Sequence, residues 1–457
     1  MKKREKMNKR VFTLFMALAV GVAAMAQDNY VTLRGHVSDA DSREGLPAVT
    51  VYVAEQAIYT QTNDDGDYVL KVPAAHSQGS VVFALMGYHR DTVALSAAMR
   101  KPNVQLRSDG GRWLKEVSVT EYSPKAVRKL LMDAVARIPQ NYETDSVVGS
   151  WFYRDVRLMN GELFLFDEMV FDALRVGYDK HHKLKKLNNR KGPYGAVLID
   201  YNRPIESNYT TIRHDRLLLC DTGYVSRVTN GMADNYIAYS EHEVLFDPVE
   251  VPNTQANLAD RYVKKAKNLQ MHEIVDADGK EYYVITRDLD VSQKNMIQLK
   301  QSVRITIAKG SLAIVGFEES QYFMMHPYFP IKQIFKQAGV DSIAYETHNT
   351  YHYGQMGGRY TLTSYTRHEH TYLFCAENSP LGARRQHMEK RCTCVLTGQH
   401  KEGASFLHNN VIQEPGGELV TNRRADHKQY DESFWQQYNY IPLESSIRQK
   451  LEQKLKK

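Results

Sequence analysis

Cysteine is scarce in this chain of 457 residues, which has only Cys220, Cys375, Cys392 and Cys394. So few cysteines exclude the disulfide scaffold that small secreted domains use. Cys392 and Cys394 are separated by a single residue, whereas zinc ribbons place two residues between paired ligands and need a second pair. We interpret the four as buried thiols or as one incidental bridge, and the sequence leaves their disulfide state open.

Long apolar runs and an excess of one charge are also missing. No stretch after residue 26 approaches the roughly 18 apolar residues that indicate a transmembrane helix. Residues 1–26 carry six Lys or Arg against one Glu, so five of the formal net charge of +6 lie there and the rest of the chain is near +1. This balance does not indicate the cluster of basic residues that nucleic-acid-binding proteins carry. A composition of 42% hydrophobic and 25% charged residues excludes a disordered chain.

The local motifs of common catalytic sites are absent. None of the 17 histidines has Glu three positions later, so the metal-binding motif of zinc carboxypeptidases is missing. The nucleophile motif Gly-x-Ser-x-Gly and the glycine-rich phosphate and dinucleotide loops are missing too. The adjacent acids Asp167/Glu168 and Glu318/Glu319 should point to opposite faces of strands. We therefore predict no catalytic residue, no cofactor and no metal ligand, and we expect a protein that is not an enzyme.

The first 26 residues have the three parts of a secretory signal peptide. Six basic residues precede the apolar stretch Val11–Ala23, and Ala24-Met25-Ala26 supplies the small residues that a signal peptidase needs. The alternative is a retained anchor, but about 15 apolar residues are short for a bilayer. We predict cleavage before Gln27 and export of the mature chain.

Short alternating strands separated by turn residues follow from Val31 to Leu106, a pattern typical of a small β-sandwich. Within it lie the features that carry a family resemblance: Gly35-x-Val37, Asp39, Gly45-Leu46-Pro47, Thr62-Asn63-x-x-Gly66-x-Tyr68-x-Leu70-x-Val72 and Met86-Gly87-Tyr88. Residues 27–107 thus resemble the carboxypeptidase-regulatory-like domain, a transthyretin-like β-sandwich common in Bacteroidetes cell-envelope proteins. The resemblance implies a non-catalytic module and a location in the periplasm or on the periplasmic face of the outer membrane.

The acidic turn Asn63–Asp67 of this module could suggest a calcium loop. If Gly66 were the sixth position of an EF-hand loop, the first ligand would be Gln61 and the twelfth Val72, so that motif fails. We interpret the segment as a solvated hairpin turn.

Residues 108–146 are predicted to form a linker strand at Leu114–Thr120 and an amphipathic helix. Ser123 and Pro124 are suited to begin this helix, Pro139 to end it, and an apolar stripe runs from Val127 to Ile138. We expect the stripe to pack on the sheet that follows.

Residues 147–442 are predicted to form a large antiparallel β-rich domain with few helices. Asn160-Gly161 and Asp276–Gly279 are strong hairpin signals. Residues 179–215 and 376–430 are polar and are expected to be irregular, and residues 443–457 should form a basic C-terminal helix. The fold class is therefore mainly β or α+β.

Histidine and tyrosine are the chemically suggestive residues of the large domain. His368 and His370 should share one strand face, and a metal would need a third ligand such as His352, with His348 also close in sequence. We prefer an exposed polar face. The 29 tyrosines, eight of which recur in residues 322–372, could bind a carbohydrate or an acyl chain or could simply pack the sheet.

Three functions remain open at this point. The leading hypothesis is a non-enzymatic binding or assembly protein of the cell envelope, with an envelope protein, a glycan or a lipid as partner. The second is a periplasmic carrier whose sheet forms an open half-barrel around a lipid, covered by the helix Val127–Ile138. The third is a hydrolase whose active site is assembled from residues distant in sequence.

Overall fold

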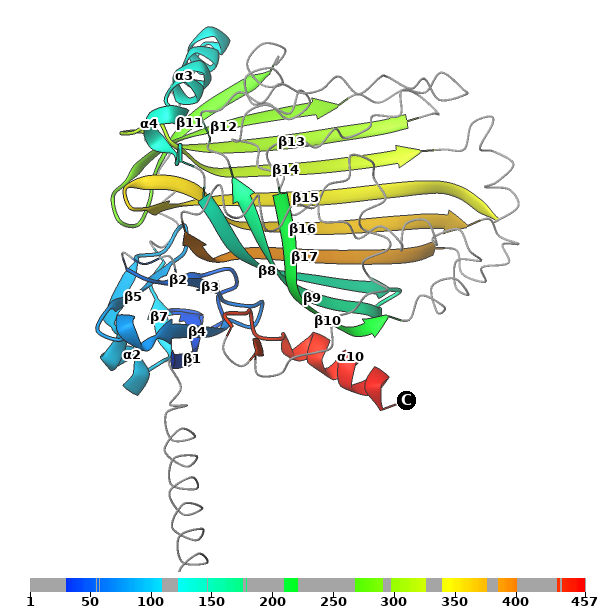
Figure 1. Ribbon diagram of the computed structural model, residues 1–457. Helices are drawn as coiled ribbons and strands as arrows, with labels where there is room; N and C mark the ends of the chain where they lie inside the picture. Colours follow the sequence, from blue (N-terminus) through cyan, green and yellow to red (C-terminus); the bar gives the residue numbers. More distant parts are fainter. Residues whose placement is uncertain are drawn as a thin grey trace, which may run out of the picture.

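The predicted mainly β fold is confirmed by a computed structural model, which contains a small sandwich and a large antiparallel sheet (Figure 1). The structure describes residues 30–54, 56, 58–108, 122–145, 147–175, 178, 209–220, 268–290, 297–325, 339–375, 385–400, 434–435 and 438–456. The predicted signal peptide, the linker strand Leu114–Thr120, Tyr328 and Phe329 lie outside these residues.

The sandwich packs a three-stranded sheet, in the order β4-β1-β7, against a four-stranded sheet in the order β3-β2-β5-β6. Apolar side chains from both sheets, such as Val37, Val51, Leu70 and Phe83, form its core. The elements are β1 (Tyr30–Asp39), β2 (Thr50–Val53), β3 (Tyr59–Gln61), β4 (Asp67–Pro73), η1 (Ala74–His76), β5 (Ser80–Ala84), β6 (Asp91–Ala94), α2 (Leu95–Arg100) and β7 (Val104–Leu106).

The large sheet has ten strands in the order β10-β9-β8-β17-β16-β15-β14-β13-β12-β11, with every neighbouring pair antiparallel. Asn160 and Gly161 both have positive φ, as a tight hairpin turn requires. The strands are β8 (Val147–Met159), β9 (Glu162–Arg175), β10 (Tyr209–Cys220), β11 (Leu269–Val275), β12 (Glu281–Asp290), β13 (Ile297–Ala308), β14 (Ile314–Met325), β15 (Val340–Met356), β16 (Arg359–Cys375) and β17 (Arg385–His400).

Two of these strands lie where we expected irregular chain, so that prediction was wrong. The first part of β10, Tyr209–Asp215, lies within the polar stretch 179–215, and all of β17 lies within residues 376–430. The polar composition of β17 concealed it, because that strand buries Gln386 and Lys390 beside Cys392 and Cys394. β17 is central to the fold, since it pairs with β16 on one side and with β8 on the other.

The helix α3 (Pro124–Ala136) packs its apolar stripe on one face of the large sheet, which we call the α3 face. The Ser123 hydroxyl accepts a hydrogen bond from the Ala126 amide at 3.3 Å, as an N-cap residue does. α3 ends at Ala136 rather than Ile138, and Pro139 lies in the first turn of α4 (Ile138–Asn141). α10 (Ser445–Leu455) packs on β8 and β9 from the opposite face.

Within the part of the chain that the structure describes, no helix is long and apolar enough to cross a membrane.

Candidate functional site

The sandwich is attached to the large sheet by the C-terminal segment that precedes α10, described at residues 434–435 and 438–444. The side chain of Asn439 accepts a hydrogen bond from the backbone amide of Lys71 at 2.6 Å and donates one to its carbonyl at 3.1 Å. The Lys71 ammonium donates to the Trp435 carbonyl at 2.9 Å and lies 4.9 Å from the centre of the Tyr440 ring. Because Lys71 is only 2% exposed, these contacts fix the position of β4 on the C-terminal segment.

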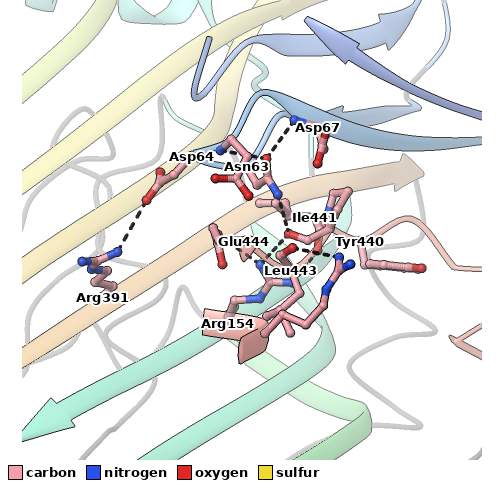
Figure 2. A network of polar contacts seen from close by, with 12 residues as sticks. Asn63, Asp64, Asp67, Arg154, Arg391, Tyr440, Ile441, Leu443 and Glu444 are labelled. Atoms are coloured by element: carbon pink, nitrogen blue, oxygen red, sulfur yellow. Dashed lines mark hydrogen bonds and ion pairs between the residues drawn. The ribbon is translucent and has the colours of Figure 1, made fainter. Parts of the chain in front are cut away.

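The acidic turn Asn63–Asp67 is a second attachment point (Figure 2). The Asn63 carboxamide oxygen accepts hydrogen bonds from the amides of Asp65 and Asp67, and its nitrogen donates to the Pro442 carbonyl at 3.4 Å. Asp64 pairs with Arg391 of β17 at 3.5 Å. Asn63 is 3% exposed. The turn is therefore a docking element, which corrects our interpretation of a solvated hairpin turn.

Arg154 of β8 holds the other side of the C-terminal segment. Its guanidinium pairs with Glu168 at 2.6 Å and donates to the carbonyls of Ile441 and Pro442. Figure 2 shows Arg154 beside Ile441. Arg154 and Glu168 are 4% and 0% exposed. A buried charged pair with additional carbonyl partners orients the segment strongly, since removing either charge leaves the other unpaired.

A polar groove of about 1000 Å³ lies on the face of the large sheet that also carries α10 and the C-terminal segment, opposite the α3 face. We call this face the groove face. Its side chains form two rows that cross β12, β13, β14, β15 and β16. Residues in register on neighbouring strands make up each row. The first row is Asp288, Ser302, Ser320, His348 and His368.

The second row lies two residues along each strand from the first. It consists of Asp290, Lys300, Tyr322, Glu346 and His370. Beyond the first row, the register partner of His368 on β17 is Arg391, the residue that binds Asp64. The docked sandwich therefore stands directly beside one end of the groove.

Hydrogen bonds orient two of the groove's histidines, His348 and His370. The two ring nitrogens of His348 contact the Ser320 hydroxyl at 2.7 Å and the Thr350 hydroxyl at 3.2 Å. His370 shares a hydrogen bond of 2.9 Å with His387 of β17. Burial, and then the neighbouring His370, lower the pKa of His387 below its ordinary value, which favours the neutral form of the His387 ring.

The predicted metal candidates His348, His352, His368 and His370 all lie on the groove face. His348 and His368 are register partners, whereas His352 is paired with Ser364 further along the sheet. Among the residues that the structure describes, no group of three or more His, Cys, Asp or Glu side chains is arranged to hold a metal ion.

Apart from the histidines and Tyr322, the groove residues were missed by sequence reasoning, although a signal for them exists. Each of the five successive strands β12 to β16 carries polar residues or tyrosine at two positions that are separated by one residue. The pairs are Asp288/Asp290, Lys300/Ser302, Ser320/Tyr322, Glu346/His348 and His368/His370. Such spacing puts both members on one strand face, but only the strand register shows that the five pairs meet.

The α3 face is densely packed. Tyr351 and Tyr365 are buried with their ring centroids 4.7 Å apart, and Tyr142 lies edge-on against Tyr353. Burial raises the pKa of Tyr365 well above its ordinary range, as expected for a ring inside a core. The aromatic strands thus supply packing at this face.

Charged side chains also lie on the α3 face. Arg157 binds Asp155 at 2.9 Å, and Asp167 is the register partner of Asp155. Asp167 and its neighbour Glu168 therefore point to opposite faces, toward Asp155 and Arg154 respectively. Cys375, Cys392 and Cys394 are thiols rather than disulfide-bonded half-cystines, and burial raises the pKa of Cys392.

Fold and groove together define a two-domain β protein in which a small sandwich is fixed beside a polar groove of a large antiparallel sheet. The sandwich belongs to a known type, because residues 33–119 match the family model of the CarboxypepD_reg-like domain. This match confirms the resemblance inferred from Gly35, Gly66 and the residues around them. No curated protein matches the chain.

Proposed function

We propose that the protein is exported and acts without catalysis, as a binding or assembly protein in the periplasm or on the periplasmic face of the outer membrane. The predicted signal peptide and the CarboxypepD_reg-like domain support this location. The groove is the observation that carries the binding role. Its polar side chains stand on regular strands, which present them in a fixed arrangement before any ligand arrives.

The test is capture of a partner from envelope fractions by the mature chain. Ser302→Trp would place a large ring in the first row, and Lys125→Trp on the exposed surface of α3 is the matched control. We expect a protein, glycan or lipid to be recovered with the wild type and the control but not with Ser302→Trp. Equal recovery by both variants would reject the groove, and no recovery by the wild type would reject the binding role.

A lipid carrier is less well supported by the described residues. Tyr351 and Tyr365, two of the tyrosines that could have lined an acyl cavity, pack against each other in the core of the α3 face. The groove on the other face is lined mainly by polar side chains. Lipid extraction of the captured material tests this alternative in the same experiment.

A hydrolase is the third candidate, and it is favoured by one observation: the groove brings together residues that the sequence separates. Glu346 and His370 are register partners, and a carboxylate beside an imidazole is a general acid–base arrangement. Turnover of peptide or glycoside substrates that is lost in Glu346→Gln would favour this function over simple binding.

A further inference from the structure

The groove has the dimensions of a site for an extended polymer. It crosses five strands, and four spacings of about 4.8 Å give a length of about 19 Å. The two rows are separated by two residues along each strand, or about 7 Å. A ligand lying across the strands would thus meet a polar side chain from each row at every strand.

The chemistry of the rows is a mixture of donors and acceptors with little net charge. Three carboxylates (Asp288, Asp290 and Glu346) face one ammonium (Lys300), so the formal charge with neutral histidines is −2. Phosphate, acidic lipid headgroups and nucleic acid are disfavoured by this sign. An acyl chain is disfavoured as well, because it would leave the hydrogen-bonding groups unpaired.

A polyhydroxylated ligand meets these conditions. Each hydroxyl both donates and accepts, so it can bind a carboxylate and an imidazole or ammonium at the same time. Tyr322 is only partly buried, and its ring offers an apolar surface for the C–H face of a sugar while its hydroxyl contacts Met324 sulfur at 3.3 Å. His348 is already oriented by Ser320 and Thr350, which lowers the cost of ordering it on binding.

We propose that the groove binds an uncharged oligosaccharide in extended form, an inference that rests on the proposed binding function. The two rows contact successive sugar units, with Asp288 and Glu346 as hydroxyl acceptors and the ring of Tyr322 beneath one unit. The sandwich beside His368 limits the length of chain that fits.

A glycan array probed with the mature protein tests this proposal. Neutral glucans, mannans and chitin-type oligomers form one set, and uronic, sialylated and sulfated oligomers form the other. We expect binding to the neutral set. For the best neutral probe, Glu346→Gln and Asp288→Asn should each weaken affinity by about tenfold or more, because each replaces a charge-assisted hydrogen bond with a neutral one. Asp341→Asn, an exposed residue of β15 outside the groove, should bind like the wild type.

Preference for the acidic set, or equal binding by all variants, would overturn the proposal. Far-UV spectra of the variants must match the wild type. If no oligosaccharide binds but envelope capture remains sensitive to Ser302→Trp, the binding function stands and the oligosaccharide inference is rejected. If capture fails as well, both are rejected.

Discussion

The three carboxylates of the Asn63–Asp67 turn each contact another part of the protein. Asp64 binds Arg391, Asp65 accepts a hydrogen bond from the Ser445 amide at 2.6 Å, and Asp67 pairs with His36 at 2.9 Å. Each carboxylate therefore has a partner within the protein. Two of the three partners belong to β17 or α10, so the turn links the sandwich to the rest of the molecule.

Gly66 is the residue of this turn that is least tolerant of substitution. Its φ is +88°, and an added Cβ would lie 2.5 Å from the Val37 carbonyl oxygen and 2.8 Å from Gly45 Cα. Gly161 has a similar φ of +82° but open space around it. We expect Gly161→Ala to lower the free energy of unfolding by about 1 kcal/mol and Gly66→Ala by about 3 kcal/mol or more. Urea denaturation of both variants measures the difference, and equal losses would show that backbone crowding at Gly66 is unimportant.

His387 should make the stability of the protein depend on pH. Its pKa is lowered in the folded state, so below about pH 6.5 the unfolded chain binds more protons than the folded one. The free energy of unfolding should therefore fall as the pH drops from about 6.5, and level off below the folded pKa. His387→Gln removes the ionisable group while keeping a side-chain amide for His370. Denaturation at pH 7.5, 6 and 5 should show a shallower decline for this variant, and an unchanged slope would contradict the assignment.

At the scale of elements, the C-terminal segment acts as a connector between two sheets. Trp435 and Ile441 pack on Phe152, Val170 and Val395 of the large sheet, while Asn439 binds the backbone of β4. One short segment thus buries apolar side chains on one domain and satisfies backbone groups of the other.

Asn439→Ala should weaken this connection. It leaves the backbone amide and carbonyl of Lys71 without these two partners in a buried position, which should cost about 2–3 kcal/mol. Asn103→Ala is the control, because Asn103 makes an exposed hydrogen bond to the His36 amide, whose loss should cost well under about 1 kcal/mol. Thermal unfolding followed by circular dichroism compares the two, and similar shifts would contradict the role of Asn439.

Elements specified by nearby residues were predictable, whereas those specified by distant partners were not. The Asn160-Gly161 hairpin and the Ser123 N-cap of α3 are local signals, and both are present in the structure. β17 was missed because its polar residues become buried only through pairing with β8 and β16. The groove was missed for the same reason, since its rows join side chains from five strands.

At the scale of the whole molecule, the sandwich has its own core, but part of its surface is covered by the C-terminal segment. Its apolar cluster lies inside the sandwich. Thr60, Gln61 and Asn63, however, are polar and at most 3% exposed, and they lie where the C-terminal segment covers the sandwich. Separation of the domains would therefore expose polar groups that are now paired, without opening the core.

Residues 27–107 expressed alone should consequently fold and melt cooperatively, although at a lower temperature than the same domain in the full chain. A synthetic peptide of residues 434–445 should raise that melting temperature in a concentration-dependent way, because it binds the folded state. A disordered spectrum would reject the domain boundary, and no response to the peptide would reject the docking role of the segment.

The pairing of β8 with β17 has a consequence for the order of events during synthesis. Met159 and Met388 are register partners although 229 positions separate them in sequence (388 − 159). Contacts between such distant segments slow folding. Until β17 has been made, β8 has an unpaired edge of backbone amides and carbonyls, which is the feature through which strands associate between molecules. The incomplete chain, rather than the finished protein, is therefore the form most exposed to aggregation, and a chaperone that covers β8 would be needed for only that interval.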